Sequence, residues 1–186
     1  MTTIRISTYA IYNAGSLRGF DLDLDQCYDQ EDVDQAMAAG LDTLGDPDPE
    51  IMIQDVEGHY VIRKIVDRLG VGAWLYNLHE YTERSQHDAD RLAVAFENNS
   101  WDLASDLEKE PDLDLEAWTA DRVFHVYGAD NAQEALQEYL ADYYPETLDA
   151  LNEIGWLFID WKESAAANLS PINTFEIDGR CIYFIS

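Results

Sequence analysis

The sequence predicts an α+β fold, in which mixed α/β segments with small antiparallel sheets lie before and after a helical cluster. Apolar and polar residues alternate, as in strands, within residues 1–59 and 127–186. Apolar residues within 60–126 instead follow helical spacing. We therefore expect an N-terminal α+β subdomain (1–59), a central helical subdomain (60–126) and a C-terminal α+β subdomain (127–186).

The N-terminal segment predicts three short strands and one helix. Polar residues alternate with Ile4 and Ile6 in "TIRIST", and alternation returns in "GFDLDL". A further strand is expected in "EIMIQD", after the breaker "GDPDP". The helix is expected in "DQEDVDQAMAAG", with Asp29 as its N-cap and Gly40 just beyond its end.

The central segment predicts several short helices. One helix, in "VIRKIVDRL", ends at Gly70, and others are expected in "GAWLYNLHEYTERS" and "HDADRLAVAFENN". A separate helix is expected in "SWDLASDLEKE", with Ser100 as its N-cap and Pro111 beyond its end. The last piece of the cluster is "LDLEAWTADRVF".

The C-terminal segment predicts two helices and a hairpin. The first helix has apolar residues at offsets 0, 3, 4, 7, 8 and 11, namely Ala132, Ala135, Leu136, Tyr139, Leu140 and Tyr143. Pro145 suits the first turn of the second helix. Asp178 and Gly179 separate two β-prone runs, which predicts a tight hairpin turn.

The charge of the chain is its most unusual feature. Its 186 residues include 38 Asp and Glu against 11 Lys and Arg, for a formal net charge of −27. Direct binding to nucleic acid is not expected, because affinity for phosphates depends on Lys and Arg. Halophilic adaptation, solubility, cation binding and imitation of a polyanion remain open.

We expect a soluble, cytoplasmic protein without membrane contact. The chain begins without the basic region and apolar run of a signal peptide, and no stretch has the roughly 18 consecutive apolar residues of a membrane span. Cys27 and Cys181 show no metal-binding or redox spacing and are expected to be free thiols.

The acidic residues are patterned along the chain. No Lys or Arg occurs from residue 19 to residue 62. Carboxylates recur every four residues at Asp102, Asp106 and Glu110, and again at Asp130, Glu134, Glu138 and Asp142. Like charges at this spacing destabilise a helix by about 0.2–0.5 kcal/mol per pair. Since duplex DNA carries one charge per ≈1.7 Å, the charge of −27 matches roughly 46 Å of duplex. Spacing alone fits a solvated face equally well.

No pattern predicts catalysis. The four histidines, His59, His79, His87 and His125, are dispersed and form no metal-binding motif. Neither a GxSxG nucleophile motif nor a phosphate-binding glycine loop is present. We therefore expect a protein that is not an enzyme, with no catalytic residue, no metal ligand and no cofactor.

One stretch has the spacing of a calcium-binding EF-hand loop. Five aspartates, at positions 1, 3, 5, 9 and 12 of such a loop, are Asp21, Asp23, Asp25, Asp29 and Asp32. However, position 6 is Gln26 where the loop needs Gly, and position 12 is Asp where the loop uses Glu. Calcium binding is therefore an alternative and not the main hypothesis.

Four blocks occur in order along the chain: "YAIYNAGSLRGFDLDL", "DPDPEIMIQDVEG", "FIDWKESAAANL" and "FEIDGRCIYFI". Together they resemble the ArdA-type antirestriction proteins. The matching positions include Tyr12, Asn13, Gly15, Gly19, Gln54, Asp55, Glu57, Gly58, Asp160 and Trp161. Val56 departs from the aromatic residue usual in that family, and residues 60–126 match only in being acidic and helical.

The resemblance implies an elongated homodimer of small subdomains whose carboxylates imitate the phosphates of bent B-form DNA. Such proteins occupy the DNA-binding channel of Type I restriction–modification enzymes in the host cytoplasm and are encoded by plasmids, transposons or phages. The carboxylates expected to form this surface are Asp21, Asp23, Asp102, Asp106, Glu110, Asp112, Asp114, Glu116, Asp130, Glu134, Glu138, Asp142, Glu146, Asp149 and Glu153. The alternatives are an acidic calcium-binding protein, or a DNA mimic directed at another host defence such as a CRISPR effector.

Overall fold

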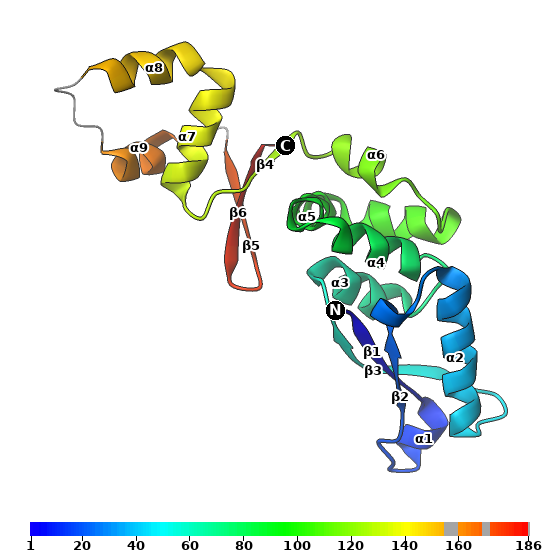
Figure 1. The fold of residues 1–186 in the computed structure, drawn as a ribbon. Coiled ribbons are helices and arrows are strands. Elements are labelled where there is room, and N and C mark those ends of the chain that lie inside the picture. Colours follow the sequence, from blue (N-terminus) through cyan, green and yellow to red (C-terminus); the bar gives the residue numbers. More distant parts are fainter. Residues whose placement is uncertain (155–159, 169–171, 186) are drawn as a thin grey trace. The chain divides into compact units, whose positions relative to one another are not determined.

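The computed structural model describes residues 1–154, 160–168 and 172–185 and confirms the α+β class (Figure 1). Two antiparallel three-stranded sheets have the strand orders β2-β1-β3 and β4-β6-β5. The chain forms two compact units, Met1–Trp118 and Thr119–Ser186, which we call unit 1 and unit 2. The expected boundary after residue 59 does not separate compact units, because α3 (Tyr60–Leu69) packs on β3 (Ile51–Glu57).

The sheet of unit 1 is built around β1 (Thr3–Thr8). This strand lies between β2 (Phe20–Asp23) and β3. Ile4 and Ile6 are fully buried, as the alternation predicts. The strand ends at Thr8, whose hydroxyl accepts a hydrogen bond from the backbone N–H of Ile11 and caps the short helix α1 (Tyr9–Asn13).

Helix α2 (Gln30–Leu44) packs along β2 and begins after the predicted N-cap, Asp29. Its predicted end was wrong, because the helix continues through Gly40 and ends at Gly45, whose φ is +70°. Gly40 instead allows α2 to pack closely against Phe20 of β2. A methyl group at this position would overlap the ring of Phe20, so only glycine allows the helix to approach the strand this closely.

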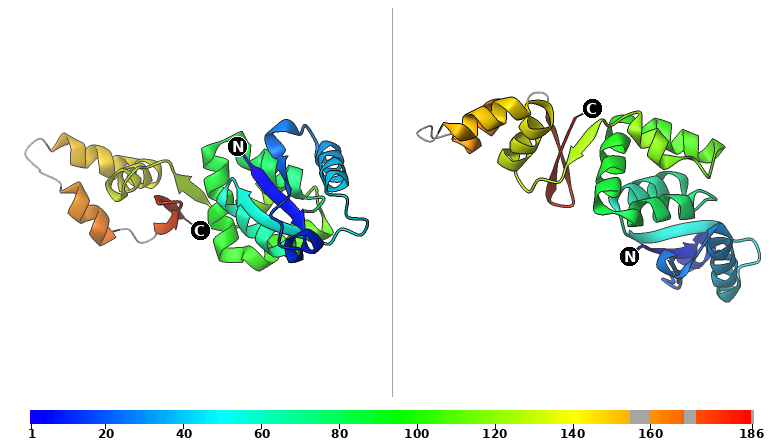
Figure 2. Two further views of the ribbon diagram at one scale, coloured as in Figure 1. Left: turned by 90° about the horizontal axis from the view of Figure 1, so that it is seen from below. Right: turned by 45° about the horizontal axis from the view of Figure 1, so that its top comes forward.

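The remaining helices of unit 1 gather on one side of its sheet (Figures 1 and 2). They are α3, α4 (Leu75–Arg84), α5 (Gln86–Lys109) and α6 (Leu115–Ala120). Helix α3 ends at Gly70, as predicted. The predicted break with Ser100 as N-cap was wrong, because α5 is continuous. Its buried residues continue across this point, with Leu92 before it and Leu103 after it.

Within its described residues, unit 2 combines the second sheet with three helices. Its elements are β4 (His125–Tyr127), α7 (Ala132–Tyr143), α8 (Pro145–Glu153), α9 (Trp161–Asn168), β5 (Asn173–Ile177) and β6 (Arg180–Ile185). Strand β4 begins inside the range expected to be helical, because the backbone of residues 125–127 pairs with β6. The predicted hairpin turn is confirmed: Asp178 and Gly179 have φ of +48° and +78°, as a type I′ turn requires.

The core of unit 2 forms where α7 covers the sheet. Its buried cluster consists of Tyr127, Ala129, Ala135, Ile172 and Tyr183. Helices α8 and α9 both contact α7. The block "FIDWKESAAANL" lies partly outside the described residues, while its Asp160 precedes α9 and accepts a hydrogen bond from the backbone N–H of Glu163.

The helices of the described ranges include none with both the length and the apolar character needed to cross a membrane.

Candidate functional site

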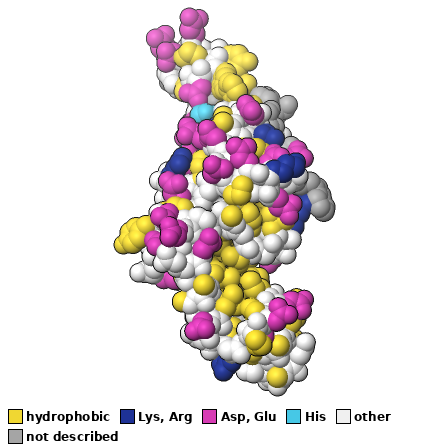
Figure 3. Space-filling model, turned by 90° about the vertical axis from the view of Figure 1, so that its right-hand side faces the viewer, with side chains coloured by type: hydrophobic (Ala, Val, Ile, Leu, Met, Phe, Trp, Pro, Cys, Tyr) yellow, Lys and Arg dark blue, Asp and Glu magenta, His cyan; other side chains and the backbone are white. Residues whose placement is uncertain are grey.

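The carboxylates expected to imitate phosphates lie on the surface. All fifteen are exposed except Asp23 and Asp106, which are half-buried. The face drawn in Figure 3 shows Asp and Glu side chains recurring over the surface, with few Lys and Arg among them. Local contacts divide the fifteen into carboxylates that have an intramolecular role and carboxylates that do not.

The row on α7 has both kinds. Its members within the helix, Glu134, Glu138 and Asp142, are exposed, whereas Ala135 and Leu136 are buried. Glu134 completes the helix N-terminus, since its Oε2 accepts a hydrogen bond of 3.0 Å from the backbone N–H of Asp130. Asp142 lies 3.9 Å from Nε2 of His125. Among the described residues, Glu138 has neither type of contact, so only part of the row is available to an external partner without loss of an internal contact.

Helix α8 is acidic and exposed. Its carboxylates are Glu146, Asp149 and Glu153, and none of its nine residues is buried. The spacings of three and four residues place these three carboxylates on one helix face. The sequence from residue 123 to residue 161, which includes α7 and α8, contains no Lys or Arg. This face therefore has no basic neighbour on its own or the preceding helix.

In unit 1, the acidic residues around α5 and α6 also differ in role. Asp106 is a structural anchor, because its Oδ2 accepts a hydrogen bond of 3.2 Å from the indole N–H of buried Trp118. Asp114 caps α6 by accepting from the backbone N–H of Ala117. Glu116 lies 3.9 Å from Arg84.

The EF-hand spacing does not produce a calcium loop. Asp21 pairs with Arg5 at 3.0 Å across the β1–β2 ladder. Asp23 caps the short 3₁₀ helix η1 (Leu24–Gln26), and Asp29 caps α2. Asp32 accepts a hydrogen bond from the backbone N–H of Tyr28. These aspartates have separate local partners and do not converge on one point.

Eight of the expected carboxylates have side chains without a hydrogen bond or ion pair within the described residues. They are Asp102, Glu110, Asp112, Asp130, Glu138, Glu146, Asp149 and Glu153. We call them the free carboxylates.

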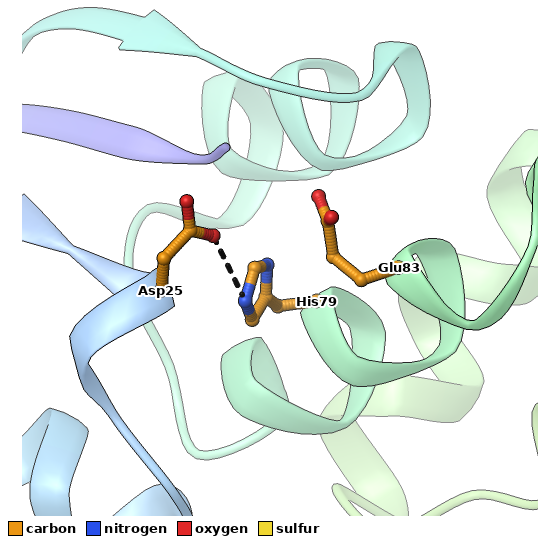
Figure 4. A group of neighbouring side chains, drawn as sticks. All are labelled: Asp25, His79 and Glu83. Atoms are coloured by element: carbon orange, nitrogen blue, oxygen red, sulfur yellow. Dashed lines mark ion pairs between the residues drawn. The ribbon is translucent and has the colours of Figure 1, made fainter.

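A different group of side chains does converge. Asp25 of η1 and His79 and Glu83 of α4 have potential ligand atoms within 4.8 Å of one another (Figure 4). Within the described residues this is the only such group of three or more His, Cys, Asp or Glu side chains. Nε2 of His79 lies 3.5 Å from Oδ1 of Asp25. The ammonium group of Met1 lies 3.7 Å from Asp25 and 3.3 Å from Glu83.

The His79 ring is buried, and its side chain is only 8% exposed. Burial lowers the pKa of His79, against the opposing influence of Asp25 and Glu83, so the neutral imidazole is favoured. Neither His79 nor Glu83 was expected at a site. Their spacing of four residues on one helix was an available signal, but Asp25 comes from a distant part of the sequence.

Comparison of the chain with protein-family models, with curated proteins and with solved structures finds no match.

Proposed function

We propose that the protein is an antirestriction protein that imitates B-form DNA through its surface carboxylates. It binds in the DNA-binding channel of a Type I restriction–modification enzyme, where Lys and Arg side chains pair with Asp and Glu in place of phosphates. The protein acts by occupying this channel and catalyses no reaction. The resemblance of the four sequence blocks supports this target, as it supports a homodimer.

The observation that carries the proposal is the set of free carboxylates. Acids that cap helices or pair with Arg have an explanation within the fold, as Glu134 and Asp21 do. The free carboxylates have no such explanation, and those on α7 and α8 have no Lys or Arg nearby in the sequence. Exposed carboxylates without internal partners suit electrostatic capture by a basic channel, which accelerates association and favours the correct partner.

Helix geometry supports the same interpretation. Four residues of α-helix rise about 6 Å, which is close to the spacing of successive phosphates along one DNA strand. On α7, Glu134, Glu138 and Asp142 follow this spacing, although only Glu138 among them is a free carboxylate. The surface therefore offers negative charges at intervals that a phosphate-binding channel accepts.

The direct test is the plating of unmodified phage on restricting and non-restricting hosts that express the protein. We expect expression to raise plating on the restricting host and to leave plating on the non-restricting host unchanged. Phage that carry the protective modification serve as the control, since restriction does not act on them. Unchanged plating of unmodified phage on a Type I-restricting host would refute the proposed target.

The surface itself is tested with purified protein. We expect the combined variant Glu138→Gln, Glu146→Gln, Asp149→Asn and Glu153→Gln to inhibit DNA cleavage by a Type I enzyme less well, because four free carboxylates are neutralised. Each exposed ion pair contributes about 0.2–1 kcal/mol, so the loss for four pairs is about 1–4 kcal/mol, or roughly 5-fold to 1000-fold in inhibitory concentration.

A matched variant controls for net charge. Asp42→Asn, Asp48→Asn, Glu50→Gln and Glu57→Gln remove four exposed carboxylates elsewhere in the chain. We expect this control to inhibit nearly as well as the parent. Equal inhibition by parent and α7–α8 variant contradicts the assignment of that surface.

A further inference from the structure

We propose that Asp25, His79 and Glu83 form a binding site for a divalent transition-metal ion, for which Zn²⁺ is the probe. This site is independent of the proposed DNA mimicry and of the EF-hand spacing, since it uses only one of the five spaced aspartates. It also departs from the sequence-based expectation of no metal ligand.

The donor set points to this class of ion. Imidazole nitrogen suits zinc, iron, nickel and copper, whereas magnesium and calcium are bound by oxygen ligands alone. One imidazole and two carboxylates therefore match the mixed nitrogen and oxygen coordination of Zn²⁺. Three protein ligands leave room for a water molecule in a fourth position.

The geometry of the three side chains is close to that of a bound site. Zn–N and Zn–O bonds of about 2.0–2.2 Å place two ligand atoms of a tetrahedral site about 3.4 Å apart. Nε2 of His79 and Oδ1 of Asp25 are already 3.5 Å apart. Glu83, whose side chain is 47% exposed, has the freedom to close the remaining gap.

The surroundings of the three side chains combine a buried imidazole with a bound positive charge. Only 6% of the surface of His79 is exposed, and its Nδ1 has no hydrogen-bond partner within the described residues. In Figure 4 the ring lies between Asp25 and Glu83. The Met1 ammonium group already lies against both carboxylates, so a positive charge is stable there.

Two secondary-structure elements, α4 and η1, fix the positions of the three ligands. His79 and Glu83 are four residues apart on α4 and therefore lie on one face of the helix. Asp25 is held by η1, which directly follows the buried part of β2. A bound ion would join η1 to α4 and stabilise the packing of α4 in unit 1.

The test is calorimetric titration of the untagged full chain with Zn²⁺ at about 0.15 M NaCl and with excess Mg²⁺. Salt and Mg²⁺ suppress diffuse binding to the other carboxylates. We expect saturable binding of one Zn²⁺ per chain, weakened at least about tenfold by His79→Gln and by Glu83→Gln. Matched controls are His87→Gln and Glu80→Gln, which change exposed residues of the same two types and should bind as the parent does.

Circular dichroism separates loss of binding from loss of folding. His79 is buried, so its variant needs this check, whereas Glu83 is exposed and its glutamine variant keeps the same shape. Absence of saturable binding at one ion per chain overturns the proposal. Binding that a folded Glu83→Gln variant retains at parental affinity overturns it as well. Neither result bears on phage plating, which tests the proposed function separately.

Discussion

Asp102 and Asp106 lie one turn apart on α5, yet the structure gives them different roles. Asp106 accepts a hydrogen bond of 3.2 Å from the indole N–H of Trp118, which is 5% exposed. Asp102 is one of the free carboxylates. We expect Asp106→Ala to lower the free energy of unfolding and Asp102→Ala to leave it almost unchanged.

The magnitude follows from burial. Removing an acceptor from a buried N–H costs about 1–3 kcal/mol, whereas an exposed substitution changes stability by about 0.5 kcal/mol or less. Both variants replace Asp by Ala within the same helix, so the gain in helix propensity cancels in their difference. The ion pair of Asp106 with Lys109, at 3.7 Å and exposed, adds only a few tenths. The expected difference in unfolding free energy is therefore about 1–3 kcal/mol.

The assay is urea unfolding followed by circular dichroism and tryptophan fluorescence, since the two units can unfold in separate transitions. The same variants are compared as inhibitors of Type I cleavage. Asp102→Ala should weaken inhibition without loss of stability, and Asp106→Ala should lose stability while its folded fraction still inhibits. Equal unfolding free energies for the two variants would refute the division into structural and free carboxylates.

Two further predictions concern packing and titration. Gly40→Ala should destabilise the protein by about 1–3 kcal/mol, because the added methyl group overlaps the Phe20 ring. Thermal unfolding measures this loss, and an unchanged melting temperature would contradict the close packing of α2 against Phe20. Burial raises the pKa of Tyr127 far above its usual value. Above about pH 10 the unfolded chain loses the phenol proton while the folded chain keeps it. The free energy of unfolding is therefore expected to fall as the pH rises above this value. Tyr127→Phe should lose less stability between neutral and strongly alkaline pH than the parent, and parallel pH profiles in urea unfolding would show that Tyr127 is not responsible.

Features encoded by neighbouring residues were predicted from the sequence. The N-cap Asp29, the helix end at Gly70 and the turn at Asp178 and Gly179 each depend on backbone geometry within a few residues. Caps and tight turns depend on a few neighbouring residues, so the sequence predicts them without knowledge of the fold.

Features that depend on distant partners were not predicted. Ser100 was a plausible N-cap, but buried residues on either side of it keep α5 continuous. Gly40 had the sequence pattern of a helix end, but it lies within α2 because only glycine fits against the Phe20 ring. Strand β4 exists because β6 pairs with it. Tertiary packing overrode local preference in each case.

The candidate surface shows the same limit. Sequence spacing correctly indicated exposed carboxylates on α7. It did not show that Asp106 binds Trp118 or that Asp21 pairs with Arg5, because these partners meet only in the folded chain. The convergence of Asp25 with His79 was hidden for the same reason.

Acidic residues at helix N-termini and at helix C-termini have opposite effects on the stability of the fold. A helix N-terminus stabilises negative charge, so Asp29 and Asp114 offset part of the mutual repulsion of the carboxylates. The C-terminus of a helix has the opposite preference. Glu153 nevertheless ends α8, whose last turn contains no basic residue. Stability alone favours Lys or Arg at such positions. A carboxylate there becomes favourable when an external partner supplies the positive charge, which is the role that we propose for the basic channel of the target.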